Sequence, residues 1–275
     1  MIGQVTLQNR VRNLKEAKRF PHFAIFVGER GSGRMTFIKE NFKGIFLEDV
    51  KVDSIRNMIQ MAYKMYDKVF VIPYADNMSN AARNALLKVV EECPNNNYFI
   101  MILEDENNTL ETIRSRATIF HMDRYSSHEL IEYVTSYIPI PPSNGDKFIK
   151  LFTDLCETPG EVNILASQNA EDFYKYVQLV VDNIAEVSTA NAFKIPSKVA
   201  LKDDAEGYDL RLFWKAFIQI CISNVMKHDR TSKEILKYGE AVRITGNCLQ
   251  QLRIRGINKQ MLIDTWVLEV RNIWM

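Results

Sequence analysis

The stretch HFAIFVGERGSGRM, residues 22–35, decides the fold class of this 275-residue chain. An apolar run at residues 22–27 comes directly before a glycine-rich turn and the start of a helical pattern. A nearly continuous apolar run is typical of a strand that is covered on both faces, as in a parallel sheet. Strand, glycine-rich turn and helix in this order are also the context in which a phosphate-binding loop occurs.

Four more short apolar runs follow, at residues 44–47, 68–72, 98–103 and 118–120. Helical patterns separate them, and the clearest extends from Asn80 to Glu92, with one apolar stripe along it. Ser79 is a suitable N-cap for this helix, and Pro94 disfavours helical geometry at the residue before it. Strands that alternate with helices predict an α/β fold, a three-layer sandwich with right-handed crossovers around a parallel sheet.

After residue 123 the pattern becomes helical. Ser126 and Glu129 form a capping box for a helix through about Tyr137, and a second helix is predicted at about residues 146–156. The sequence Thr158-Pro159-Gly160-Glu161 opens a third, with Thr158 as cap and proline in the first turn. The chain is predicted to be helical again from about residue 168, with a break at residues 188–204. We therefore predict three domains, at residues 1–123, 124–167 and 168–275.

Composition indicates a soluble globular protein, with 47% hydrophobic and 25% charged residues. The formal net charge of +1 argues against a freestanding polyanion binder but leaves room for a local basic patch. No apolar run reaches the roughly 18 residues of a membrane helix, and the N-terminus does not resemble a signal peptide, so we expect a cytoplasmic protein. The four cysteines form no CxxC pair, which predicts neither a metal site nor a disulfide framework.

The glycine-rich turn lacks two side chains that a working phosphate loop needs. Gly28, Gly31 and Gly33 allow backbone N–H groups to surround a phosphate at a helix N-terminus. Arg34 and Met35 occupy the positions of the phosphate-binding lysine and the magnesium-binding serine or threonine. Arg34 keeps the charge in a planar guanidinium, whereas Met35 has no oxygen for a hard cation.

A second magnesium contact is also missing. The strand at residues 68–72 is followed by Pro73 and Tyr74, where a hydrolysing enzyme carries an acidic residue, and Asp76 comes only later. Two missing contacts to the same cation predict that hydrolysis has been lost. Passive binding of nucleotide or phosphate, and a turn that binds nothing, both stay open.

Several motifs in order resemble a known family, the small subunits of the DNA polymerase clamp loader in the AAA+ superfamily. The most similar pattern is that of the bacterial delta-prime subunit. The residues that carry the resemblance are Ile2-Gly3-Gln4, residues 20–28, 75–94 and 112–117, and Thr158-Pro159-Gly160-Glu161. The family's zinc-binding cysteine cluster is absent, and Ala117 replaces the cysteine of its Ser-Arg-Cys motif. The resemblance implies an AAA+ parallel-sheet sandwich, then a small helical lid domain and an all-α collar domain.

The resemblance gives Arg116 a role as an arginine finger that reaches the ATP site of a neighbouring subunit. A guanidinium supplied in trans stabilises the charge that develops on a transferring phosphoryl group. A local surface salt bridge is the alternative, and Arg114 is the residue most easily confused with Arg116.

The resemblance also implies partners: loader ATPase subunits that bind ATP and Mg²⁺, a sliding clamp and primed DNA. This chain would require no cofactor of its own, and no membrane partner is expected. Arg83 and Lys88 are candidate DNA contacts, and Arg10, Arg12, Lys15, Lys18 and Arg19 make the first twenty residues basic. A solvated helix face is the alternative for both groups.

Two further functions stay open. One is an active AAA+ ATPase with an atypical phosphate loop, and the other is an AAA+ adaptor outside replication. The leading prediction is a non-catalytic subunit of the clamp loader.

Overall fold

The computed structural model describes residues 2–142, 144–184, 193, 198–200, 207–226, 231–252, 254 and 256–274. The chain forms two compact units, which are described separately. Unit 1 consists of Met1–Glu129 and Thr158–Gly160, and unit 2 consists of Leu130–Glu157 and Glu161–Met275. The division into three domains stays a prediction.

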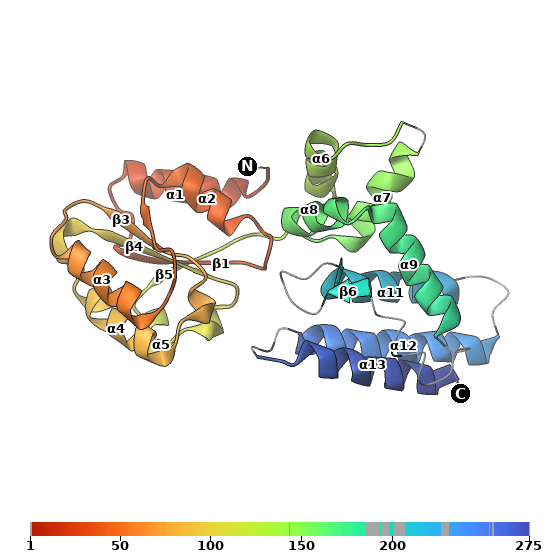
Figure 1. The fold of residues 1–275 in the computed structure, drawn as a ribbon. Helices are drawn as coiled ribbons and strands as arrows, with labels where there is room; N and C mark the ends of the chain where they lie inside the picture. Colours follow the sequence, from red (N-terminus) through yellow and green to blue (C-terminus); the bar gives the residue numbers. More distant parts are fainter. Residues whose placement is uncertain are drawn as a thin grey trace. The chain divides into compact units, whose positions relative to one another are not determined.

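Unit 1 is built on a five-stranded parallel sheet (Figure 1). Its strands are β1 (Phe23–Val27), β2 (Ile45–Phe46), β3 (Val69–Ile72), β4 (Tyr98–Leu103) and β5 (Thr118–His121). They are arranged in the order β2-β3-β4-β1-β5, and every pair is parallel. β1 lies between β4 and β5 and is buried along its whole length, as its continuous apolar run predicts. The predicted α/β fold is confirmed.

Helices cover both faces of this sheet. The helices α1 (Val5–Glu16) and α2 (Arg34–Asn41) pack on one face, where Ala24 and Phe26 point. The helices α3 (Val52–Ala62), α4 (Asn80–Glu91) and α5 (Glu111–Arg114) pack on the other, where Phe23, Ile25 and Val27 point. Short 3-10 turns stand between these elements, at η1 (Ala75–Asn77), η2 (Pro94–Asn96) and η3 (Glu106–Asn108). Alternate residues of a strand face opposite sides, so one strand supplies two cores.

The predicted start of α4 is confirmed, and its end lies one residue before the predicted Glu92. The Ser79 hydroxyl accepts a hydrogen bond from the Ala82 N–H at 3.2 Å, and the helix ends at Glu91, just before Cys93 and Pro94. The capping box of α6 (Ser127–Tyr137) also forms, because Ser126 and Glu129 exchange side-chain-to-backbone hydrogen bonds.

Unit 2 is mainly helical. Its remaining helices are α7 (Gly145–Leu155), α8 (Pro159–Ser167), α9 (Ala170–Asn183), α11 (Leu210–Val225), α12 (Ser232–Gln251) and α13 (Lys259–Trp274). The fully buried Phe213, Trp214 and Phe217 of α11 pack around Trp266 of α13. The first residues of α6 and α8 belong to unit 1, and both helices continue into unit 2.

One feature of unit 2 differs from the sequence-based expectation. A small parallel pair, β6 (Val199–Ala200) with β7 (Tyr208–Asp209), lies in the region predicted to be all-α. The equally short β2 was predicted from the apolar run at residues 44–47, whereas β6 and β7 lie where a break or a helix was predicted. β6 falls within the predicted break at residues 188–204, most of which lies outside the described residues.

None of the helices in the described part of the chain is both long enough and apolar enough to cross a membrane.

Candidate functional site

The glycine-rich loop lies at the carboxyl end of β1, and α2 begins directly after it at Arg34. Gly31 and Gly33 have φ angles of +85° and +84°, in the left-handed region that favours glycine. Gly28 has a different constraint, because a Cβ there would lie 2.7 Å from the Cβ of Met122. Each predicted glycine therefore has a steric or conformational reason to be glycine.

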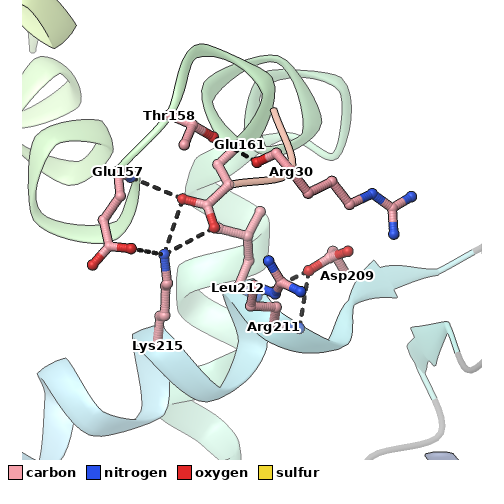
Figure 2. Close-up of polar contacts among 8 residues, drawn as sticks. All are labelled: Arg30, Glu157, Thr158, Glu161, Asp209, Arg211, Leu212 and Lys215. Carbon is pink, nitrogen blue, oxygen red and sulfur yellow. Dashed lines mark hydrogen bonds and ion pairs between the residues drawn. The ribbon is translucent and has the colours of Figure 1, made fainter. Parts of the chain in front are cut away.

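Three successive carbonyl groups of the loop accept hydrogen bonds from other segments of unit 1. The Thr158 hydroxyl donates to the Arg30 carbonyl at 3.3 Å, as Figure 2 shows. The Gly160 N–H donates to the Gly31 carbonyl at 3.0 Å, and the Tyr125 hydroxyl donates to the Ser32 carbonyl at 2.9 Å. The chain itself thus holds the loop at three consecutive positions.

The contact between Gly31 and Gly160 is very close. A Cβ on Gly160 would lie 2.4 Å from the Gly31 Cα, and a Cβ on Gly31 would lie 2.6 Å from the Thr158 Oγ1. Neither backbone has room for a side chain at this point. Sequence reasoning identified Gly31 as a phosphate-loop residue and Gly160 as part of a helix start, but it did not pair them. The only available signal was the glycine of the Pro159-Gly160 pair.

Arg34 and Met35 have different surroundings. The Arg34 Nη2 lies 3.4 Å from the Glu104 Oε1, and the Arg34 side chain is only 12% exposed. This burial lowers the pKa of Arg34, while the nearby carboxylates of Glu104 and Asp76 act in the opposite direction. Met35 packs against the apolar core beneath α2, whereas Thr36, the nearest hydroxyl along the helix, is exposed.

The positions after β3 are occupied by structural contacts. Pro73 is buried, and Tyr74 is 65% exposed with a φ of +51°. Both carboxylate oxygens of Asp76 accept hydrogen bonds from the Glu104 N–H, at 3.0 and 2.9 Å. The side-chain amide of Asn108 donates to Asp76 at 2.9 Å. Asp76 therefore ties η1 to the segment that follows β4, and Glu104 connects it to Arg34.

Arg114 is the last residue of α5, and Arg116 lies two residues after it. Their side chains contact different neighbours. The Arg116 Nη2 lies 3.1 Å from the Glu91 Oε1, with the two side chains 45% and 53% exposed. The Arg116 Nη1 also donates to the Thr112 carbonyl at 3.1 Å, and the Arg114 Nη1 donates to the Asn107 Oδ1 at 2.6 Å. The surface ion pair considered as the alternative for Arg116 is present, and almost half of the side chain stays exposed.

The candidate DNA contacts on α4 are not equivalent. The Arg83 guanidinium donates to the Asn80 Oδ1 and to the Asp76 carbonyl, both at 3.2 Å. The Lys88 Nζ is exposed and lies 5.8 Å from the ring centroid of Tyr63. Arg83 is thus held to η1, and Lys88 is the freer of the two cations.

A charged cluster in unit 2 was not predicted. The Lys215 Nζ of α11 contacts both carboxylate oxygens of Glu161, at 2.8 and 2.9 Å, and the Glu157 Oε2 at 3.0 Å (Figure 2). The Glu157 N–H also donates to the Glu161 Oε2 at 2.8 Å, and the Glu161 side chain is 10% exposed. The cluster fixes α8 against α11. No sequence signal relates residues that are 54 positions apart.

The cysteines are free thiols in buried or half-buried surroundings. Burial raises the pKa of Cys93 to about 11 and that of Cys221 to about 12, so both are protonated at neutral pH. Within the described ranges, no group of three His, Cys, Asp or Glu side chains is arranged to hold a metal ion.

Comparisons with known proteins find clamp-loader subunits among the similar sequences. The family model described as "DNA polymerase III, delta subunit" matches residues 35–126. A replication factor C small subunit of Methanosphaera stadtmanae is 22% identical over 76% of this chain and 72% of its own length. The DNA polymerase III subunit delta' of Haemophilus influenzae is 30% identical over 32% of this chain, which spans only 28% of that relative.

A solved structure has the same fold. The DNA polymerase III gamma subunit-related protein of Thermotoga maritima aligns with a TM-score of 0.52 at 14% identity, covering 96% of this chain and 99% of that one. The fold, the matched family model and the relatives agree in one respect: this chain is similar to clamp-loader AAA+ proteins, among them delta-prime and replication factor C small subunits.

Proposed function

We propose that this chain is a non-hydrolysing subunit of a sliding-clamp loader. It supplies Arg116 in trans to a neighbouring ATPase subunit while the clamp is loaded onto primed DNA. ATP and Mg²⁺ are bound by the partner subunits, and the chain works in the cytoplasm without a cofactor of its own.

The environment of the glycine-rich loop is the observation that carries the non-hydrolysing role. Mg²⁺ requires oxygen ligands at about 2.0–2.1 Å, and position 35 offers a thioether. The Asp76 carboxylate already accepts hydrogen bonds from Glu104 and Asn108. The residues present therefore do not fit a magnesium ion, and we derive no hydrolytic step from this edge of the sheet.

The internal hydrogen bonds of the loop support the same role. Thr158, Gly160 and Tyr125 hold three successive carbonyls in place by contacts within unit 1. The loop conformation thus needs no phosphate to order it. A subunit of this kind serves as a fixed support for its neighbours rather than as a site of turnover.

The exposure of Arg116 supports the role in trans. An exposed ion pair such as Arg116–Glu91 contributes about 0–1 kcal/mol, so little free energy is lost when Arg116 leaves Glu91. A guanidinium that binds a transferring phosphoryl group accelerates hydrolysis by about 10³–10⁵-fold. The segment can therefore exchange a weak local contact for a strong one on a neighbouring subunit.

The decisive experiment uses the reconstituted loader with clamp and primed DNA. Arg116→Ala should leave assembly intact and reduce hydrolysis at the adjacent site by about 10³-fold. Glu91→Gln and Arg114→Ala are matched controls, since each removes a partner or neighbour of Arg116 and should preserve turnover. Unchanged turnover with Arg116→Ala would exclude the finger role.

Two simpler measurements separate the alternatives. The isolated chain should show no magnesium-dependent ATP hydrolysis, whereas turnover that follows the chain through successive columns would support an active ATPase. Co-purification followed by mass spectrometry should recover ATPase subunits and a ring-shaped clamp. Recovery of neither would favour an adaptor outside replication.

A further inference from the structure

One helical layer of unit 1 is strongly basic. The exposed lysine and arginine side chains of α1, the turn after it, α2 and the loop before β2 are Arg10, Arg12, Lys15, Lys18, Arg19, Lys39 and Lys43. Over the same elements, which are described without a gap, the exposed acidic side chains are Glu16 and Glu40. The whole chain has a net charge of +1, so an excess of acidic residues elsewhere offsets this layer.

The opposite helical layer has a different charge distribution. The elements α3, α4 and α5 carry cations and anions in similar number: Asp53, Arg56, Arg83, Lys88, Glu91, Glu111 and Arg114. Two ion pairs form on that side, Arg56 with Asp53 at 3.7 Å and Arg116 with Glu91 at 3.1 Å. The basic charge is therefore concentrated on one side of the sheet.

Six of the cations form a set that we call the basic face: Arg12, Lys15, Lys18, Arg19, Lys39 and Lys43. The seventh cation, Arg10, has its guanidinium 4.7 Å from the ring centroid of Phe120 on β5 and is not counted in the set. The ion pairs found in the described part of unit 1 use Arg34, Lys51, Arg56, Arg116 and His121, and none uses the basic face. Its charges are therefore available to an external anion.

Part of the basic face is held in place by the protein. The Lys15 ammonium donates a hydrogen bond to the Asn41 carbonyl and lies 4.6 Å from the ring centroid of Phe42. Arg12 and Lys15 line a shallow depression of about 470 Å³, together with Gln8, Glu16 and Asn41. Positive side chains that are already ordered lose less conformational entropy when an anion binds.

The face has no apolar centre. Among the exposed large hydrophobic side chains of unit 1, Val5 is the one that lies on α1 or α2, whereas Met61, Tyr63, Tyr66 and Tyr74 lie on other elements. Protein–protein interfaces are enriched in aromatic residues at their centre and depleted in lysine. Interfaces with nucleic acid are more polar and much more positive, which is the character of this surface.

We propose that the basic face of α1 and α2 binds the phosphate backbone of duplex DNA without sequence preference. The binding of DNA by this face does not depend on the finger role of Arg116. It is also separate from the predicted contacts of Arg83 and Lys88, which lie on α4 in the opposite layer.

The test measures binding of the purified full-length chain to a fluorescently labelled duplex, by anisotropy, over a range of salt concentrations. The variant carries Arg12→Gln, Lys18→Gln and Arg19→Gln. The matched control carries Lys51→Gln, Lys64→Gln and Lys68→Gln, three exposed lysines outside the basic face. Both variants lose the same formal charge, so only the location of the charge differs.

Each lost phosphate contact should reduce the slope of log K against log salt by about 0.9. For the basic-face variant, we therefore expect the slope of log K against log salt to fall in magnitude by about 2 to 3. Its affinity for the duplex should fall at least about tenfold, whereas the control variant should keep the slope and the affinity of the parent chain. Equal losses in the two variants, or no loss in the first, would overturn the proposal.

A competition experiment distinguishes DNA from an acidic protein. Unlabelled duplex and poly-glutamate are compared as competitors by the concentration of their charged groups, phosphate in one and carboxylate in the other. The unlabelled duplex should displace the labelled duplex at the lower concentration. Displacement by poly-glutamate at equal or lower concentration would identify a surface for acidic protein and would overturn the DNA assignment. Circular dichroism melts of both variants should match the parent chain, because the substituted side chains are exposed.

Discussion

The glycine-rich loop and the Arg114–Arg116 segment both lie in unit 1, but they differ in their contacts and in their exposure to solvent. The loop is held through three carbonyls, and Gly31 lies against Gly160 with no room for a side chain. The Arg114–Arg116 segment makes side-chain contacts at the surface, and Arg116 is 45% exposed. Contacts in the first region are internal, whereas the second leaves a charged group available.

Because of this difference, substitutions in the two regions should affect different properties, stability in the first and action on partners in the second. Substitutions at the loop and its neighbours should change stability, because they disturb close-packed backbone and buried polar contacts. Substitutions at the arginine segment should change only what the protein does with partners, because exposed ion pairs contribute little to folding.

The largest expected effect is that of Gly160→Ala. The new Cβ would lie 2.4 Å from the Gly31 Cα, and backbone on both sides cannot move without breaking the hydrogen bond between them. We expect a loss of about 2–3 kcal/mol in the free energy of unfolding, measured by urea titration with circular dichroism.

The control for this change is Gly246→Ala in α12. A Cβ there meets nothing within 4 Å, and alanine is favoured over glycine inside a helix by up to about 1 kcal/mol. If Gly246→Ala raised the free energy of unfolding and Gly160→Ala left it unchanged, the close contact between Gly160 and Gly31 would not contribute to stability.

A smaller loss is expected for Asp76→Asn. The change removes a charged acceptor that binds the Glu104 N–H and the Asn108 amide, so about 1–2 kcal/mol should be lost in the same titration. Asp53→Asn, at an exposed ion pair on α3, is the control and should stay within about 0.5 kcal/mol of the parent. Equal effects would mean that Asp76 has no special structural role.

The smallest effect on stability is expected for Arg116→Ala. Its ion pair with Glu91 is exposed on both sides, so the free energy of unfolding should change by less than about 0.5 kcal/mol. A loss above about 1 kcal/mol, measured by the same urea titration, would make Arg116 a structural residue and would remove the contrast between the two regions.

Local patterns explain why much of unit 1 was predictable. Residues 98–103 were predicted as a strand and form β4, and the predicted strand at 22–27 differs from β1 by one residue. Buried strands carry continuous apolar runs, and helix ends carry caps such as Ser79, so the signal lies within a few residues. The strands β6 and β7 were not predicted, because the first lies in the predicted break and the second in a region predicted to be helical.

The contacts around the loop could not be predicted because they join distant segments. Tyr125 donates to Ser32 across 93 positions, and Thr158 donates to Arg30 across 128. The same holds for Lys215 with Glu161 in unit 2. Each partner looks ordinary in its own neighbourhood, and only the folded chain brings the pair together.

The sequence by itself determined the parallel α/β core, the glycines of the loop and the thioether of Met35 at the position where a phosphate loop carries serine or threonine. These follow from residue types and short-range periodicity, which act before any distant contact forms. Only the tertiary structure decided that Gly160 closes on Gly31, that Asp76 binds the Glu104 N–H, and that six cations gather on one side of the sheet. The reason is physical: hydrogen bonds and close packing depend on distances in space, and only folding sets these for residues far apart along the chain.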